Sequence, residues 1–272
     1  MKSFTMNALA VAVLGMAGIG SAMAACPTIT QPPTSGSPGG GGAWSSQTIG
    51  STATMNITSP GLNSTGCALA LSIGGTPTAG VKAVVTDNSP QNEPRYRARF
   101  YFDKSALTLS NAGFQMRMFN AFANTAPGTL PTDEIRIFLV GSSVRFQVAD
   151  VTQPSGYKTI TDSALPASAN GHYYVEFDLN SGTGSGAVAG ATCNTCNAGD
   201  AGCFRYWVTA EGTSSSDGSA TGTCSLNNGG WSGVKVANLG LSSANANFRG
   251  ANLNANFSVD EFDSRRQTFI GQ

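Results

Sequence analysis

Two carboxylates in one stretch of the chain could do acid and base chemistry together. Glu176 and Asp178 alternate with apolar residues, so on a strand they would project from the same face. Neighbours at i and i+2 can place their carboxyl groups about 5 Å apart, the separation that a retaining glycosidase requires. The alternative, which we favour, is a solvated face on which both acids pair with Arg205 or another arginine.

The single histidine, His172, is the second candidate for chemistry. It precedes Tyr173 and Tyr174, and a histidine and a tyrosine can act as base and acid in a polysaccharide lyase. A histidine that opens a strand is more often structural. One histidine also argues against a serine triad and against histidine-rich metal sites. We therefore expect no cofactor, and although a structural calcium ion is compatible with the sequence, no residues can be assigned to it.

Arginines and aromatic residues recur together on the polar faces of the expected strands. The arginines are Arg97, Arg99, Arg117, Arg136, Arg145 and Arg205, and the interleaved aromatic residues are Tyr101, Phe119, Phe138 and Trp207. Adjacent strands could combine them into a basic stripe suited to an acidic or planar glycan, although cross-strand pairing with acids explains the same residues without a ligand. The ligand-binding candidates are Trp207, Tyr174, Arg205, Arg97 and Arg136, acting from a concave sheet by stacking and hydrogen bonding.

The cysteine count favours disulfides. The six cysteines are Cys26, Cys67, Cys193, Cys196, Cys203 and Cys224. Cys26 and Cys67 lie far from the other four in sequence and could pair with each other, but the connectivity is open. The other four could be a zinc site or a redox pair, yet their spacing is irregular and the Cys-x-x-Cys lies in a loop composition. We favour two disulfides between Gly182 and Gly233.

The N-terminus has the features of an export signal. Lys2 precedes an apolar stretch over residues 8–19 that is too short to span a bilayer, and Ala22-Met23-Ala24 offers a cleavage site. We expect a signal peptide at 1–24 and a secreted, periplasmic or cell-surface protein without a transmembrane segment. Lipidation of Cys26 is a competing interpretation. We disfavour it because the five remaining cysteines are an odd number, which would leave one of them without a disulfide partner.

The composition indicates a single domain after this signal, with few charged residues on its surface. Charged residues make up 11% of the chain, against about 25% in typical soluble domains, and there are 34 glycines. The chain has 15 basic and 15 acidic residues, and loss of Lys2 leaves a net charge of minus one, so we expect no nucleic-acid partner. Residues 25–45 form a Pro/Gly-rich leader, and 46–272 form the domain.

Apolar residues recur at every second position along the expected domain. The alternating sets are Tyr96, Ala98, Phe100 and Phe102; Phe114, Met116 and Met118; Ile135, Ile137 and Leu139; Val144, Phe146 and Val148; Tyr173, Val175, Phe177 and Leu179; and Phe204, Tyr206 and Val208. Turns at 141–143 and 154–156 join the middle segments into a meander. The pattern predicts an all-β, two-sheet antiparallel sandwich of the jelly-roll type. The Asn-rich stretch 246–255 imitates two pentapeptide repeats, and we expect a loop there.

Two patches resemble laminin-G-like and concanavalin-A-like domains. Residues 171–182 resemble a strand of those families, with Gly171 in place of the usual Trp, and Phe248-Arg249-Gly250 followed by residues 259–262 resembles their closing strand. The resemblance implies a jelly roll that binds glycans or protein partners and sometimes carries a glycoside hydrolase site. Glu176 and Asp178 resemble the glucanase pattern Glu-x-Asp-x-(x)-Glu, but its third acid is absent.

Together these features predict a secreted or cell-surface binding module, non-catalytic and with a polysaccharide or cell-surface glycan as its partner. One alternative is a glycan-degrading enzyme that uses Glu176 and Asp178 or His172. A second alternative is a structural envelope protein.

Overall fold

The computed structural model describes residues 44–50, 52–75, 79–183, 201–223, 226–265 and 268–271. The expected signal peptide, its cleavage site and the lipidation alternative at Cys26 lie outside these residues and stay predictions. No helix in the described part of the chain is long and apolar enough to cross a membrane.

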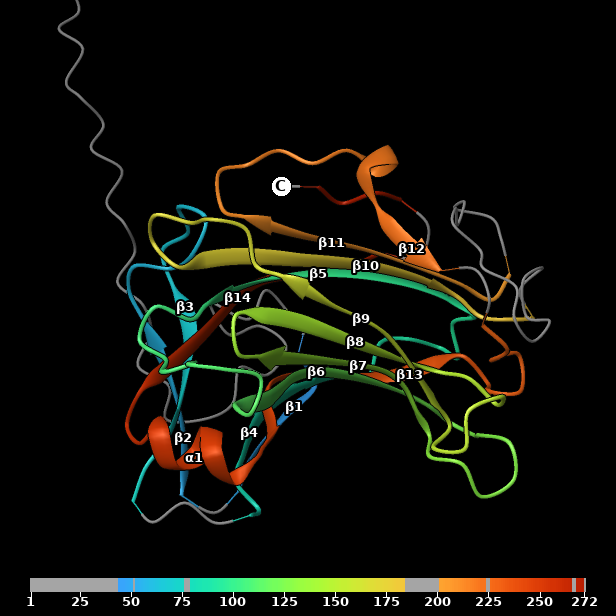
Figure 1. Ribbon diagram of the computed structural model, residues 1–272, viewed down its shortest axis with the longest axis horizontal. Coiled ribbons are helices and arrows are strands. Elements are labelled where there is room, and N and C mark those ends of the chain that lie inside the picture. Colours follow the sequence, from blue (N-terminus) through green and yellow to red (C-terminus); the bar gives the residue numbers. More distant parts are fainter. Residues whose placement is uncertain are drawn as a thin grey trace, which may run out of the picture.

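The strands form two antiparallel sheets of seven strands each, packed face to face (Figure 1). Sheet A has the order β1 (Ser46–Gly50), β4 (Lys82–Asp87), β13 (Val234–Ala244), β6 (Gln115–Ala123), β7 (Asp133–Val140), β8 (Ser143–Ala149) and β9 (Tyr157–Ala164). Sheet B has the order β12 (Thr221–Thr223), β11 (Cys203–Ala210), β10 (His172–Asn180), β5 (Arg95–Asp103), β14 (Asn256–Arg265), β3 (Ala68–Ile73) and β2 (Ala53–Thr58). The predicted sandwich is confirmed, and β6 to β9 form the predicted meander.

The alternating apolar residues line the interior between the two sheets. Aromatic rings from both sheets meet there: Phe119 of β6 lies 5.8 Å from Phe100 of β5 and 5.0 Å from Phe177 of β10, measured between ring centroids. Each buried phenylalanine contributes about 1.5–3 kcal/mol of burial free energy. The sheets are therefore held by one continuous aromatic and aliphatic core.

Two β-bulges change which side chains enter this core. Phe119 was expected on the polar face beside Arg117, but the β6–β7 register shifts between these residues and turns Phe119 inward. Further along the same pair, Ala121 faces Ile135 and Phe122 faces Asp133, so Glu134 is the extra residue of β7. A bulge re-aims side chains in this way.

Two other segments also differ from expectation. A short helix, α1 (Ala246–Ala251), forms where we expected a loop, because the Asn245 side chain caps it by accepting from the Phe248 N–H and Phe248 itself is buried. Trp44, placed in the leader by sequence, is buried with its ring centroid 4.7 Å from that of Phe262.

Both cysteines in the described residues, Cys67 and Cys203, are disulfide-bonded. The remaining four cysteines lie outside the described part of the chain. The predicted connectivity, including the pairing of Cys26 with Cys67, therefore stays a prediction.

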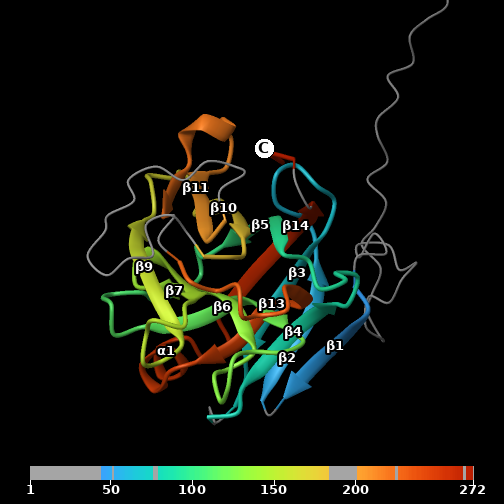
Figure 2. The ribbon, with the colours of Figure 1, turned by 90° about the vertical axis from the view of Figure 1, so that its right-hand side faces the viewer.

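The two sheets bend in the same sense, which makes their outer faces different in shape. The outer face of sheet A is concave and the outer face of sheet B is convex (Figure 1). The C-terminal end lies on the convex side of sheet B in both views, above β10 and β11 in Figure 1 and above β5 and β14 in Figure 2. A 3₁₀ turn, η1 (Asp217–Ser219), flanks the same side.

Candidate functional site

The two candidate catalytic carboxylates lie on the convex face and are bound to arginines. Glu176 is fully buried and Asp178 is 3% exposed, so the face is not the solvated one that we expected. The Arg97 Nε lies 2.6 Å from a Glu176 oxygen, and the Arg205 Nη2 lies 2.6 Å from Asp178. Arg95 also binds Asp178 in a bidentate manner, with its Nε 3.1 Å from Oδ1 and its Nη2 3.0 Å from Oδ2. The expected pairing with Arg205 is therefore present, in a buried setting.

Asp217 of η1, which lies outside the sheet, is the third carboxylate that binds these arginines. It accepts from Arg97 at 3.0 Å and from Arg205 at 3.4 Å. Burial opposes ionisation of Asp217, but the hydrogen bonds and charges of these two arginines hold its pKa below the ordinary value. We call the six residues Arg95, Arg97, Arg205, Glu176, Asp178 and Asp217 the convex-face network. Three guanidinium groups face three carboxylates, so the network carries no excess charge.

The C-terminal residues cover the network. The backbone N–H groups of Ile270 and Gly271 each donate to Glu176 at 2.9 Å, one to each oxygen. Phe269 lies 5.3 Å from Trp207 between ring centroids. The candidate ligand-binding residues Trp207 and Tyr174 are 4% and 0% exposed, and they lie on the convex side and not on a concave sheet. Ligand binding by them stays a prediction.

His172 lies at one end of β10, away from the carboxylates. It is four residues before Glu176 on the same strand, which corresponds to about 13 Å. Its Nδ1 is 2.7 Å from Glu211, which also accepts from the Asn170 amide at 2.6 Å. These residues line an open polar pocket together with Asn63. The structure therefore does not bring His172 together with Glu176, and it gives the imidazole a partner, Glu211, that the sequence did not indicate.

The concave face of sheet A carries a second group of arginines and aromatic residues, which we call the concave-face cluster: Arg117, Asn120, Asp133, Arg136, Phe138 and Tyr157. The Arg136 guanidinium lies 3.6 Å above the centre of the Tyr157 ring. The Arg117 guanidinium lies 5.1 Å from the centre of the Phe138 ring. Such stacking fixes the plane of each guanidinium.

Asp133 is the acidic partner that both arginines share. It lies 3.0 Å from Arg136 and 3.5 Å from Arg117, and it also accepts from the Asn120 amide at 3.3 Å. Burial and, next in size, repulsion from Arg136 lower the pKa of Arg117, and the attraction of Asp133 is the smaller opposing effect. The two guanidinium groups are therefore incompletely neutralised.

Several buried polar atoms of the concave-face cluster have no hydrogen-bond partner among the described residues. They are the Nε atoms of Arg117 and Arg136 and the Oδ1 of Asn120. Buried polar atoms are normally paired, with protein, water or a ligand. Burial, then the charge of Asp133, raises the pKa of Tyr157, so its phenol stays protonated at neutral pH. The partly exposed guanidinium groups of Arg117 and Arg136 are what the cluster offers an anion, as hydrogen-bond donors and as a positive field.

Sequence reasoning found this cluster in part. Arg136 was a ligand-binding candidate, and Arg117 and Phe138 were members of the expected stripe. Asn120, Asp133 and Tyr157 were missed, although Asp133 and Tyr157 each begin a strand of the predicted meander. Their positions at the ends of two strands of the meander could have indicated that Asp133 and Tyr157 lie close together.

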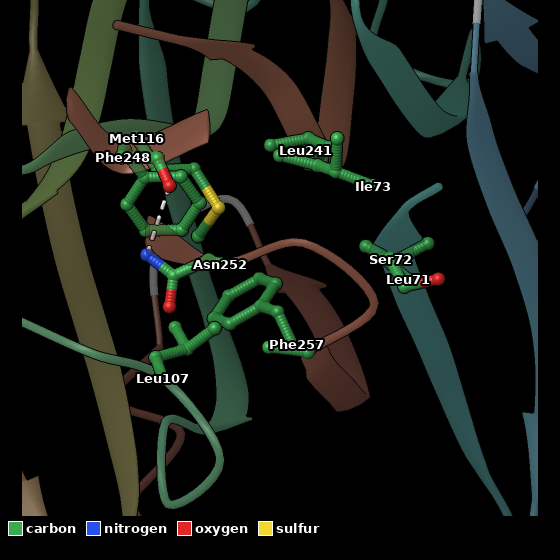
Figure 3. Close-up of a pocket in the computed structure, with 10 residues that line it drawn as sticks. Leu71, Ser72, Ile73, Leu107, Met116, Leu241, Phe248, Asn252 and Phe257 are labelled. Atoms are coloured by element: carbon green, nitrogen blue, oxygen red, sulfur yellow. Dashed lines mark hydrogen bonds between the residues drawn. The ribbon is translucent and has the colours of Figure 1, made fainter. Parts of the chain in front are cut away.

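A small gap between α1 and the sheets is too narrow to be a ligand site. Its lining is mostly apolar and includes Leu107, Met116 and Phe257 (Figure 3). It measures about 10 Å³, which is room for one water molecule at most. Asn252 donates to the Phe248 carbonyl at its edge, at 2.9 Å. Within the described residues no group of three or more His, Cys, Asp or Glu side chains could hold a metal ion.

No protein-family model matches the chain, and no curated protein matches its sequence. Solved structures match its fold. An endo-β-1,4-glucuronan lyase from the fungus Trichoderma reesei is 13% identical with a TM-score of 0.54, over 83% of this chain and 92% of that one. The ligand-binding domain of botulinum neurotoxin serotype D, in complex with N-acetylneuraminic acid, is 12% identical with a TM-score of 0.44, over 82% of this chain and 43% of that one.

A carbohydrate esterase from the Shiga toxin-encoding bacteriophage phi24B is 10% identical with a TM-score of 0.47, over 82% of this chain and 90% of that one. At these identities a structural match speaks for the fold alone, and of these three structures the lyase is the one with a TM-score above 0.5. Membership of the laminin-G-like or concanavalin-A-like families stays a prediction. The chain shares the jelly-roll β-sandwich fold of the glucuronan lyase.

Proposed function

We propose that the protein is an exported carbohydrate-binding module that holds an acidic glycan against the concave-face cluster. One observation carries the proposal: Arg117 and Arg136 are stacked on aromatic rings, share the single carboxylate of Asp133, and keep 22% and 18% of their side chains exposed on this face. Export rests on the expected signal peptide. The glucuronan lyase with the same fold is named for a glycan of the proposed class.

A sugar carboxylate would satisfy what this face lacks. A guanidinium presents its N–H groups in a fixed fork that matches a carboxylate, and stacking has already restricted its orientation. A second negative charge would also relieve the repulsion between Arg117 and Arg136. Gln147, directly opposite Arg136 on β8, lies on the same face and can bond sugar hydroxyls.

Binding is a better fit than catalysis to these residues. The raised pKa of Tyr157 keeps its phenol protonated, which makes it a poor general base. The only histidine lies in the pocket of Glu211, on the other sheet. Both oxygens of Glu176 are occupied by Arg97 and the C-terminal backbone. The glycan-degrading and envelope-structural alternatives are separated from binding by the experiment below.

The test compares two hexasaccharides with the same β-1,4 backbone, one of glucuronic acid and one of glucose (cellohexaose), by isothermal titration calorimetry. We expect the glucuronan hexamer to bind at least about tenfold more tightly, because a charge-assisted hydrogen bond contributes about 1.5–3 kcal/mol. Arg136→Gln should remove most of this preference. The control Arg145→Gln, on the neighbouring strand, should not, because Asp162 already satisfies its guanidinium at 2.6 and 2.7 Å.

Equal affinity for both hexamers, or an equal loss in the two variants, would refute the proposal. New reducing ends, or unsaturated ends that absorb in the ultraviolet, would favour the enzyme alternative if Arg136→Gln abolished them. A screen on a polysaccharide array with no retention of any acidic glycan would leave the structural role as the better account.

A further inference from the structure

The C-terminal residues 268–271 occupy the middle of the convex face, over groups that are unusual for the outer surface of a sheet. Beneath them lie a carboxylate, two guanidinium groups and an indole: Glu176, Arg97, Arg99 and Trp207. Figures 1 and 2 place the C-terminal end on the outer side of sheet B. The tail is therefore bound to functional groups and not to an apolar surface.

Each contact of the tail has a counterpart in a sugar residue. The two neighbouring N–H groups of Ile270 and Gly271 donate to the two oxygens of Glu176, as a pair of vicinal hydroxyls would. The Gly271 carbonyl accepts from the Arg99 guanidinium, as a hydroxyl or ring oxygen would. Phe269 lies against Trp207, where the apolar face of a pyranose would stack.

The groups beneath the tail are held in place by residues other than the tail. Arg97 is fixed by Asp217 at 3.0 Å, and the Trp207 indole N–H donates to the Ser216 carbonyl at 2.9 Å. Arg97 also lies 4.6 Å from the centre of the Trp207 ring. Departure of the tail would leave this arrangement preorganised, which lowers the free-energy cost of binding a replacement ligand.

The charge of the face selects the class of ligand. The convex-face network pairs three arginines with three carboxylates, and Arg99 has Glu261 at 3.4 Å. A charged sugar would therefore disturb a balanced set of buried ions, whereas neutral hydroxyls can replace the backbone groups of the tail one for one. The concave-face cluster differs in charge, because its two guanidinium groups share one carboxylate and therefore favour an acidic sugar.

We propose that the convex face is a second binding site, for a neutral glycan with vicinal hydroxyls, and that residues 268–271 close it in cis. Glu176 takes two hydroxyls, Arg99 donates to a sugar oxygen, and Trp207 stacks on the ring. The site opens when the tail leaves, and it works independently of the acidic-glycan site on sheet A.

Two variants of the full chain open the site in different ways. Phe269→Ala/Gly271→Pro removes the ring and one N–H donor, and proline cannot adopt the φ of +68° found at Gly271. A stop codon after Arg265 removes the whole tail. We expect both variants to bind cellohexaose or mannohexaose at least tenfold more tightly than the unaltered chain, with a change in tryptophan fluorescence. Affinity for the glucuronan hexamer should not change, since the concave-face cluster is untouched.

Glu176→Gln in the opened protein should abolish the gain, because an amide offers only one acceptor oxygen to two hydroxyls. A synthetic peptide of residues 268–272 should compete with the hexasaccharide. The proposal is overturned if the opened variants fold and bind neutral hexasaccharides no better, if they bind only the peptide, or if neither opened variant folds, since the tail would then be a structural element.

Discussion

Glu134 allows a quantitative test of how the β7 bulge shapes the interior. The bulge turns this residue inward, and its side chain is fully buried. One carboxyl oxygen accepts from the Ser181 hydroxyl, and Oε2 has no partner among the described residues. Burial raises the pKa of Glu134 from its ordinary 4.5 to about 7, and the Ser181 hydrogen bond opposes this only in part.

The sign of the effect follows from proton counting. Between pH 4.5 and pH 7 the folded protein keeps a proton on Glu134 that the unfolded chain has released, so stability falls as pH rises through this window. A shift of this size corresponds to about 3 kcal/mol, reached near pH 7 and constant above it. Below about pH 4.5 both states are protonated and the contribution vanishes.

Glu134→Gln removes this titration and keeps an acceptor oxygen for Ser181. In urea unfolding with the disulfides intact, we expect the variant to be up to about 3 kcal/mol more stable than the unaltered chain at pH 8 and close to it at pH 4.5. As a control, Asp162→Asn should lower stability by the same small amount at every pH from 5 to 8, because the Arg145 hydrogen bond lowers the pKa of this partly exposed acid and its pH dependence therefore lies below the ordinary 3.8. Parallel stability curves for Glu134→Gln and the unaltered chain from pH 5 to pH 8 would refute the reasoning.

Three further predictions concern stability. Arg97→Leu should lower the free energy of unfolding by about 3 kcal/mol or more, because it leaves the buried Glu176 without its guanidinium; a loss below 1 kcal/mol in urea unfolding would contradict this. Gly240→Ala should lower the melting temperature, because a Cβ would lie 2.5 Å from the Ala83 carbonyl oxygen at a φ of +123°. The control Gly250→Ala should not, because a Cβ at this position of α1 would meet open space. Equal melting temperatures of the two variants in calorimetry would be evidence against the described packing. Thiol titration of the unreduced protein should detect neither Cys67 nor Cys203, and reduction should lower stability by about 2–4 kcal/mol per disulfide.

The sandwich could be predicted because the face on which a strand residue lies is decided locally. Phe100 and Phe102 alternate with Arg99 and Tyr101, and this pattern needs no knowledge of the neighbouring strands. The two-residue turn between β7 and β8 was equally local, since Gly141 supplies the positive φ of 54° that the hairpin requires.

The face of a residue was predicted wrongly where a β-bulge adds one residue to a strand, because the alternation of apolar residues does not reveal the bulge. The register shift after Arg117 moved Phe119 from the polar stripe into the core. The bulge at Glu134 buried a carboxylate inside a strand that otherwise alternates regularly. A slip of one position reverses the face of a side chain, and only the partner strand shows where it happens.

The candidate site was harder to predict, because it depends on which acid each arginine meets. Arg97 and Asp178 are directly opposite on β5 and β10, although 81 residues separate their numbers, and Asp217 approaches from a turn outside the sheet. Nothing in the sequence marks residues 268–271 as the cover of that face. The arginines of the stripe looked equivalent by type and alternation, and pairing across strands made them different.

The distribution of carboxylates between the two faces is therefore the feature that bears on function. The whole chain has equal numbers of acidic and basic residues, which hides a local imbalance. On the convex face the three carboxylates of Glu176, Asp178 and Asp217 face three arginines, whereas Arg117 and Arg136 on the concave face share Asp133. If this imbalance is the cause of binding, Asp133→Asn should strengthen the affinity for the glucuronan hexamer and steepen its dependence on salt, because it removes the acid that competes with the ligand. A weaker affinity in a folded Asp133→Asn variant would mean that Asp133 orients the arginines more than it neutralises them.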